Sequence, residues 1–501
     1  MSVPYSHIPQ SLRVPLFYAE VDNSQANSGQ ISQRALIIGQ ITSEGSATAG
    51  VPIISQGASD AIAKGGQGSV LALMTGAYRA SDDFGELWYL PLADAVGAVA
   101  AAGSISFAGA PTASGVLSIY IGASRLVPKV SVPVAITDTP ASIASAVAAA
   151  INAAANLPVT AAVDGTTATK VNVTARNKGA VGNDIDIRLN YGGAANAEAT
   201  PAGITATIVA LAGGATNPTL TAALANLGDE AFDFIVCPYT DATSLDALKA
   251  FLGDSTGRWS WTNQLYGHVF AANRGTVGAQ TTLGNGRNNQ HESILGFNDS
   301  PSPSWVWAAD YAGAAAVALR ADPGRPLQTI ALNAVLPPPI ASRYTRSERN
   351  TLLFDGISTF TVAQDGTVAL ENVITTYQKN AFGQPDDSYL EIETLFLLMF
   401  ILRDMATLIT SKYARVKLAN DGTRFAPGSA IVTPGMIRAD LIAEFRSLEY
   451  QGMVQGADAF AQGLIVQRNA TNPNRIDVLW PGALINQLRV FAVLAQFRLS
   501  A

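Results

Sequence analysis

The sequence predicts a multi-domain protein of mixed α/β and α+β class, in which a doubly wound α/β domain is interrupted by an inserted β-rich domain. In two separated stretches, 31–95 and 215–344, apolar strand-like runs alternate with helical segments, which favours a mostly parallel sheet. Between them, short alternating runs separated by Gly, Asn and Asp indicate antiparallel strands. After residue 345 the order of helices and strands predicts an α+β C-terminal domain with extended terminal strand arms.

These changes of pattern divide the chain into six predicted segments. With 501 residues the chain is too long for one hydrophobic core, which agrees with several domains. The segments are an N-terminal extended arm (1–30), the α/β domain's first part (31–95), the inserted β-rich domain (96–214), the α/β domain's second part (215–344), the α+β C-terminal domain (345–486) and a C-terminal strand arm (487–501).

The α/β domain is predicted from short apolar runs and helix start signals. ALIIG at Ala35–Gly39 is typical of a strand buried on both faces. Asn217-Pro218 predicts the N-cap and first residue of a helix that ends at Leu227. The other expected elements are helices at Ser69–Arg79, Ser244–Leu252 and Trp305–Arg320, and strands at Leu87–Leu90, Phe232–Cys237, Tyr266–Ala271 and Thr329–Val335.

The predicted inserted domain combines alternating strands with one helix. Val171 and Val173 alternate with polar residues, as half-buried strands do. Thr139-Pro140 is a start signal for an Ala-rich helix. A domain can be inserted at a surface loop at little cost, which makes this arrangement reasonable.

The segment 345–405 carries the densest set of local signals. Thr345 with Glu348, and Ser388 with Glu391, each predict a capping box at the start of a helix. Asp365-Gly366 between two β-prone runs predicts a hairpin with a type I′ turn. The run Leu395–Leu402 is apolar on every side, so the predicted helix Tyr389–Thr410 must be covered all round.

The predicted hairpin has no polar face. If it closes with a two-residue loop, Phe360 and Val362 face one side, and Val368, Leu370 and Ile374 face the other. The hairpin should therefore lie between layers, with a free edge open to another chain. Its expected docking sheet comprises Phe360, Val362, Val368, Leu370, Ile374 and Tyr377.

Two extended apolar segments at the ends of the chain are predicted to join subunits. QLRVFAVLAQFRL near the C-terminus is almost continuously apolar, so it must be covered within the fold or inserted into a neighbour's sheet. A contact between different surfaces of identical subunits propagates into rings or helical filaments. The arm residues are Val14, Leu16, Phe17, Tyr18, Leu488, Val490, Phe491, Val493, Leu494 and Phe497.

Composition supports assembly and argues against some other roles. Charged residues make up 14% of the chain, against roughly 25% in a typical soluble domain. This composition indicates surface buried between subunits, or simply an Ala/Gly-rich chain with small side chains. A net charge of -7 argues against nucleic-acid binding. The single Cys237, the lack of a signal peptide and the lack of a long apolar run predict a soluble protein made in the cytoplasm.

No residue set predicts a catalytic, cofactor or metal site. The three histidines, His7, His268 and His291, lack metal-ligand spacing. Gly253–Gly257 matches G-x-S-x-G around Ser255, but a predicted helix precedes it where a nucleophile elbow requires a strand. We therefore expect no enzyme activity and no cofactor, and keep as an alternative a serine hydrolase that uses Ser255 with His268 or His291.

The motifs of the segment 345–405 carry a family resemblance through their order and spacing. They are R-S-E-R (346–349), L-L-F-D-G-I-S-T (352–359), D-G-T-V (365–368), I-T-T-Y-Q-K-N (374–380) and D-D-S-Y-L (386–390). In this order they resemble the C-terminal part of tail sheath proteins of contractile-tailed bacteriophages, and the whole length is most similar to the Mu-like branch. The resemblance implies a subtilisin-like α/β domain that is not a protease.

The resemblance also implies a function and partners. Similar proteins form stacked hexameric rings around a tail tube, and contract to drive the tube through the host envelope during genome delivery. Their terminal segments join the sheet of an adjacent C-terminal domain, and their inserted domains lie on the outer surface. The implied partners are other copies of the chain, the tail tube protein, and baseplate and terminator proteins, without direct nucleic-acid contact or membrane insertion. The implied location is the virion, after assembly in the host cytoplasm.

One alternative remains within the same class of particle. It is another self-assembling virion protein, such as a tube or adhesin subunit. Tube subunits are usually much shorter and lack an α/β half, so the doubly wound pattern of this chain disfavours them.

Overall fold

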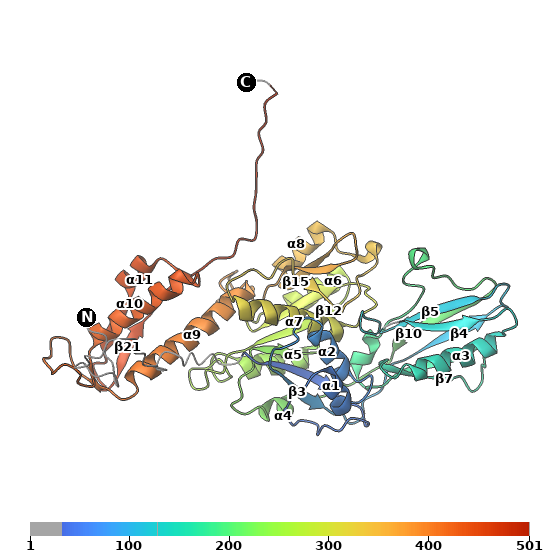
Figure 1. The fold of residues 1–501 in the computed structure, drawn as a ribbon, viewed down its shortest axis with the longest axis horizontal. Helices are drawn as coiled ribbons and strands as arrows, with labels where there is room; N and C mark the ends of the chain where they lie inside the picture. The colour runs from blue at the N-terminus through green and yellow to red at the C-terminus, as the bar shows by residue number, and fades with distance from the viewer. Residues whose placement is uncertain (1–32, 128, 500–501) are drawn as a thin grey trace, which may run out of the picture.

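The computed structural model describes residues 33–127 and 129–499. Figure 1 shows three parts along the longest axis, with a central α/β body, a β-rich part at one end and a small helical module at the other. The long helix α9 (Ile392–Tyr413) connects the body to the helical module. The prediction of a mixed α/β, multi-domain protein is confirmed.

A nine-stranded sheet forms the centre of the body. Its order is β14-β16-β15-β13-β12-β11-β1-β3-β2, and the strands from β15 to β3 run parallel. All six residues of β1 are buried, as expected for a strand covered on both faces. The strands are β1 (Ala35–Gln40), β2 (Ile53–Ile54), β3 (Leu87–Leu92), β11 (Phe234–Val236), β12 (His268–Arg274), β13 (Glu292–Phe297), β14 (Ala331–Leu332), β15 (Ile357–Val362) and β16 (Val368–Asn372).

Helices cover this sheet, and one pair packs unusually close. A Cβ on Gly313 of α7 would lie 2.5 Å from the carbonyl oxygen of Tyr78 in α2, so only glycine permits this approach. Ser69 caps α2 through its side chain. The helices of the body are α1 (Ala58–Gly65), α2 (Val70–Arg79), α4 (Thr221–Ala225), α5 (Ala242–Leu252), α6 (Val277–Asn285), α7 (Ser304–Ala321) and α8 (Arg346–Phe354), with a 3₁₀ turn at Ile340–Ser342.

Two expected boundaries in the body are wrong, and both depend on distant contacts. Helix α4 begins at Thr221, because the Asn217 side chain instead accepts a hydrogen bond from the Val181 backbone and donates one to Asp241. The expected strand Thr329–Val335 is reduced to β14. Buried Asp310 accepts the backbone N–H groups of Asn333, Ala334 and Val335 at 3.1, 2.7 and 3.0 Å, which removes them from the sheet.

The β-rich part is antiparallel, with sheets of order β10-β4-β8-β7 and β6-β5-β9. Val171 and Val173 are fully buried, and Thr139 forms a capping box with Ser142 at the start of α3. The elements are β4 (Ala102–Ala108), β5 (Gly115–Ile121), β6 (Val130–Val134), α3 (Pro140–Ala153), β7 (Val159–Val163), β8 (Lys170–Ala175), β9 (Ile187–Leu189) and β10 (Thr205–Ala212), with 3₁₀ turns at Ala180–Asp184 and Ala194–Asn196.

The hairpin of β15 and β16 forms where it was predicted, but with a different turn. The Ala363 N–H donates to Thr367 at 2.9 Å, and the Gly366 N–H donates to Ala363 at 3.1 Å, so the loop has three residues. Gly366 has a φ of 84°, whereas Asp365 does not have the positive φ that a type I′ turn requires. The prediction of a two-residue type I′ loop is therefore wrong.

The longer loop changes which side chains share a face. Phe360 lies opposite Leu370, and Val362 lies opposite Val368, and directly opposed residues lie on the same face of a sheet. All four therefore face the same side, where Phe360 packs against Trp307 of α7 with ring centroids 4.8 Å apart. The expectation that they divide between two faces is wrong.

The two predicted capping boxes have different outcomes. Thr345 and Glu348 form the first, with the Thr345 N–H donating to the Glu348 carboxylate at 2.7 Å. The second does not form, because α9 begins at Ile392 and the Glu391 carboxylate binds Arg489 instead. Ser388 lies before the helix in a turn held by Asp386.

The helical module has its own hydrophobic core, around Ile437, Leu441, Phe445 and Leu448 of α10. The Phe445 ring stacks on Phe460 at 3.9 Å. The elements of the module are β17 (Lys417–Leu418), β18 (Ile431–Val432), α10 (Pro434–Tyr450), β19 (Val454–Gln455), α11 (Ala457–Gly463), β20 (Ile465–Arg468), β21 (Ile476–Leu479) and β22 (Ala483–Leu484).

Candidate assembly surfaces

The C-terminal segment 490–499 extends away from the body without regular secondary structure (Figure 1). A row of large apolar side chains is therefore left in water, and exposed apolar patches of this kind are typical of interaction surfaces. The predicted arm residues are exposed to 68% at Leu488, 80% at Val490, 83% at Phe491, 69% at Val493, 85% at Leu494 and 84% at Phe497.

The side chains of this segment differ between its two faces. In an extended strand successive side chains point to opposite sides. Phe491, Val493 and Phe497 then share one side, and the other side changes from Val490 and Leu494 to polar residues at 496 and 498. A sheet that accepts the segment would cover both faces near residue 490, and mainly the Phe497 face near its end.

The predicted N-terminal arm residues Val14, Leu16, Phe17 and Tyr18 lie outside the described residues. Their role stays a prediction.

The expected docking sheet is mostly buried and its edge is not free. Residues Phe360, Val368, Leu370 and Ile374 are 6%, 0%, 1% and 1% exposed, whereas Val362 and Tyr377 are half-buried. On the outer side of β16, β14 pairs with Val368 and Ala369, and the Thr329 N–H donates to Leu370 at 2.7 Å. The prediction of a free edge at this hairpin is therefore wrong, and acceptance of a neighbour's arm by these residues remains untested.

A second hairpin, β20–β21, is far more exposed. It forms a separate two-stranded sheet in which neither outer edge pairs with another described strand. Val466 and Ile476 pack against the core of the helical module, while Ile465 and Leu479 are 48% and 59% exposed. Two strands alone are marginally stable, so this hairpin gains from a further strand. The isolation of these two strands from other sheets depends on how α10 and α11 pack.

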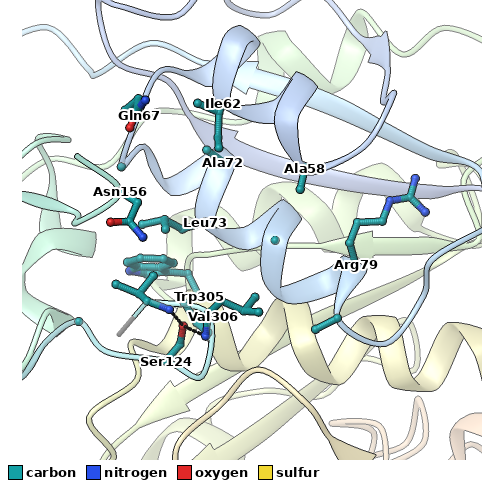
Figure 2. Close-up of a pocket in the computed structure, with 16 residues that line it drawn as sticks. Ala58, Ile62, Gln67, Ala72, Leu73, Arg79, Ser124, Asn156, Trp305 and Val306 are labelled. Atoms are coloured by element: carbon teal, nitrogen blue, oxygen red, sulfur yellow. Dashed lines mark hydrogen bonds between the residues drawn. The ribbon is translucent and has the colours of Figure 1, made fainter. Parts of the chain in front are cut away.

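A cavity of about 360 Å³ lies between α2, the start of α7 and the β-rich part. Figure 2 shows that Leu73 and Trp305 line it, while the Arg79 guanidinium points away. The Ser124 hydroxyl already accepts the backbone N–H groups of Leu126 and Val127 at 3.2 and 3.1 Å. A substrate site needs several polar groups that converge on a ligand. Ser124 and Arg79 are bonded within the chain, which leaves Gln67 and Asn156 as the remaining polar side chains of the lining, and we assign no substrate site to this cavity.

Two family models match the chain. The phage tail sheath protein central domain matches residues 213–376, and the phage tail sheath C-terminal domain matches residues 384–498. Over 499 residues the chain is 40% identical to the Mu-like prophage FluMu tail sheath protein of Haemophilus influenzae, covering 99% of this chain and 100% of that protein. The chain belongs to the Mu-like phage tail sheath proteins. It is a structural subunit of a contractile tail sheath and thus a virion component, as the resemblance implied.

Two solved structures are similar to this sheath protein over almost its whole length. The sheath tail protein of Desulfitobacterium hafniense has a TM-score of 0.47 at 13% identity, covering 95% of this chain and 97% of that chain. The helical sheath of the anti-feeding prophage in its contracted state has a TM-score of 0.46 at 12% identity, covering 98% and 100%. Because both TM-scores lie below 0.5, the family assignment rests on the sequence matches.

The residues of the hydrolase alternative do not converge in this sheath protein. Ser255 lies in a turn that follows α5, and no described hydrogen bond joins it to either histidine. His268 binds Ser293 at 2.9 Å, and both side chains are fully buried, so no substrate reaches them. His291 binds Asp254 at 2.7 Å. Burial lowers the pKa of His268 well below its usual value, and its Nδ1 has no partner among the described residues to orient it as a base.

The described part of the sheath protein shows neither a metal-ligand cluster nor a membrane-spanning helix. Within residues 33–127 and 129–499, no group of three or more His, Cys, Asp or Glu side chains could hold a metal ion. In the same ranges no helix is both long and apolar enough to span a membrane.

Proposed function

We propose that this sheath protein polymerises into stacked hexameric rings around a tail tube, and that its contraction drives the tube through the host envelope during genome delivery. Membership of the Mu-like tail sheath proteins supports this role. The observation that carries the assembly mechanism is the exposed apolar segment 490–499, which no other described part of the chain covers.

Strand donation is the proposed link between subunits. An extended segment that adds to a sheet edge gains main-chain hydrogen bonds and buries alternate side chains. The predicted acceptor was the β15–β16 hairpin, whereas the exposed β20–β21 hairpin offers unpaired edges and apolar side chains at Ile465 and Leu479. We therefore favour β20–β21 of a second copy as the acceptor. The arm Val14–Tyr18 would also pair with the sheet of a neighbouring copy.

The finer architecture is also part of the proposal. The α/β body would be a subtilisin-like domain without protease activity, in two parts, 31–95 and 215–344. The segment 96–214 would form an inserted domain on the outer surface, and 345–486 the C-terminal domain. The further partners would be the tail tube, baseplate and terminator proteins, with assembly in the host cytoplasm, no direct nucleic-acid contact and no membrane insertion.

Contraction would convert one packing of subunits into another. The extended sheath would be metastable and held by a kinetic barrier. A signal from the baseplate would let subunits rotate as rigid bodies and bury more surface between α/β bodies. The exchanged strands would keep neighbours connected throughout.

A truncation tests the strand-donation step. Removal of 490–501 should leave a folded chain, because these residues are not part of the core of the α/β body. The truncated chain should no longer polymerise, because it has no strand to donate. Electron microscopy and sedimentation would compare it with a matched variant, Gln496→Ser, which keeps the apolar side chains. Normal tubes from the truncated chain would refute strand donation by the C-terminal arm.

A further inference from the structure

The path of the chain just before the C-terminal arm points to a separate attachment. After β22 pairs with β19 in the helical module, the chain returns to the α/β body. Gly324, in the loop that follows α7, lies near the Ile485 side chain, since a Cβ there would be 3.2 Å from Ile485 Cγ2. Residues 485–489 thus run along the start of α9, and the exposed arm begins directly afterwards.

Arg489 ends this attached stretch with a buried ionic contact. Its Nη2 lies 2.7 Å from the Glu391 carboxylate, and 2.8 and 2.7 Å from the two oxygens of Glu393. The Glu393 side chain is fully buried and that of Arg489 is 14% exposed. One Glu393 oxygen also accepts the backbone N–H of Leu327 at 2.6 Å. Arg489 is therefore joined to α9 and, through Glu393, to the loop after α7.

Glu391 is in turn fixed to the segment that directly follows β16 of the central sheet. The backbone of Glu391 forms an isolated antiparallel β-bridge with Ile374, which follows β16. The Thr375 N–H donates a hydrogen bond to the Leu390 carbonyl oxygen at 2.9 Å. The attachment of Arg489 therefore reaches the nine-stranded sheet through two short contacts rather than through the helical module.

We propose that Arg489, Glu391 and Glu393 form an anchor that fixes the root of the C-terminal arm, so that tension from a second copy of the chain enters the α/β body at the start of α9. This inference rests on the proposed strand donation. Arg489 is a positioning residue, because it holds the arm without touching the neighbour. Without the anchor the tension would pass first into β22, which has two residues, and the small helical module.

The anchor also limits the distance between Arg489 and the acceptor edge on the second copy. From Arg489, residues 490–499 reach about 33 Å when fully extended. An acceptor edge on the second copy must lie within that distance of Arg489, in the extended and in the contracted sheath. If the root were released back to residue 485, the same arm would reach about 13 Å further and the limit would loosen.

Matched variants of the full chain test the anchor. Arg489→Met removes the charge at similar length, Arg489→Lys keeps the charge with fewer donors, and Arg498→Met removes an exposed arginine of the same arm as the control. We expect all three to form tubes, because the apolar arm side chains remain. The critical concentration for polymerisation should rise about tenfold or more in Arg489→Met, less in Arg489→Lys, and less than about twofold in Arg498→Met.

A second measurement separates anchoring from assembly. In the dilute, unpolymerised chain, amide hydrogen exchange at residues 485–489 and at Leu327 should be faster in Arg489→Met than in Arg498→Met, because release of Arg489 frees this stretch. If circular dichroism shows that Arg489→Met does not fold, Arg489→Lys is compared with Arg498→Met instead, both for the critical concentration and for hydrogen exchange. Equal critical concentrations and equal exchange in the arginine 489 and 498 variants would overturn the anchor and leave strand donation intact. Polymerisation of the chain truncated after Arg489 would overturn strand donation itself.

Discussion

The ion pair between Asp233 and Arg403 should stabilise the packing of α9 on the α/β body. Asp233 precedes β11 and is fully buried, and Arg403 of α9 reaches it where the helix leaves the body. Arg403 also lies over the Tyr266 ring, 5.9 Å from its centroid. Beyond this point α9 carries the separate core of the helical module, so the pair lies at the junction between the two.

The expected magnitude follows from the burial of both charges. Either single change, Asp233→Ala or Arg403→Met, leaves one buried charge without its partner, which should cost about 3–5 kcal/mol of stability. The double variant leaves no uncompensated charge, so it should lose less than either single variant. Two independent contacts would instead give losses that add.

The sign of the pH dependence provides a second check. Burial raises the pKa of Asp233, and the Arg403 charge opposes that shift. In Arg403→Met the opposing charge is gone, so the folded state holds a proton that the unfolded chain, with a carboxyl pKa of about 3.9, has released. Stability then falls as pH rises, and the loss relative to the native chain should be larger at pH 8 than at pH 5.

Urea unfolding of the dilute full chain, followed by circular dichroism at both pH values, measures these quantities. Additive losses in the double variant, or an Arg403→Met deficit that does not grow with pH, would refute the reasoning. Lys412→Met on the same helix serves as the control, because Lys412 is half exposed and pairs with Asp440 at 3.3 Å near the surface.

Two further changes test other parts of the fold. Phe445→Ala removes a buried ring stacked on Phe460 and should cost about 3–5 kcal/mol, enough for limited proteolysis to cut the helical module while the α/β body stays intact. Asp82→Asn should cost about 3 kcal/mol at pH 7. Burial favours a raised pKa for Asp82, but hydrogen bonds from Tyr78 and Arg320 outweigh it and lower the pKa. The stability that Asp82 contributes is present above about pH 4 and is lost as pH falls further, so thermal unfolding should show the Asn deficit shrinking in acid. A deficit independent of pH would contradict the assignment.

Local signals predicted well wherever the partner groups are close in sequence. The Thr345–Glu348 capping box forms because its two members satisfy each other three residues apart. Ser388 and Glu391 carry the same signature, but Arg489, 98 residues after Glu391, takes the carboxylate. No pattern within a short window contains that competitor.

The hairpin shows a second limit of local reasoning. Asp365-Gly366 fits a two-residue loop as well as a three-residue loop that ends in a glycine with positive φ. One extra loop residue shifts the register and moves side chains to the opposite face. The sequence thus located β15 and β16, whereas the common face of Phe360, Val362, Val368 and Leu370 depended on the turn.

The candidate surfaces were predicted in part. The almost continuously apolar run 488–497 predicted a C-terminal segment that needs a cover, and its apolar side chains are exposed in the structure. The exposed edges of β20–β21 could not be predicted, because their exposure depends on whether other strands pair with them in the folded chain. The anchor at Arg489 was missed for the same reason, since a single arginine in an apolar run has no local sign of its buried partners.

The short strands at both ends of the central sheet have a consequence for how growth of the polymer is directed. β2 and β14 each have two residues, and Asp310 keeps β14 short by holding the backbone of residues 333–335. Long, uncovered edges invite sheets to fuse side by side, and brief edge strands suppress that reaction. The nine-stranded sheet, the largest among the described residues, thereby offers no long edge for unplanned pairing. The buried Asp310 carboxylate thus limits side-by-side pairing of the central sheet by keeping one of its edge strands short.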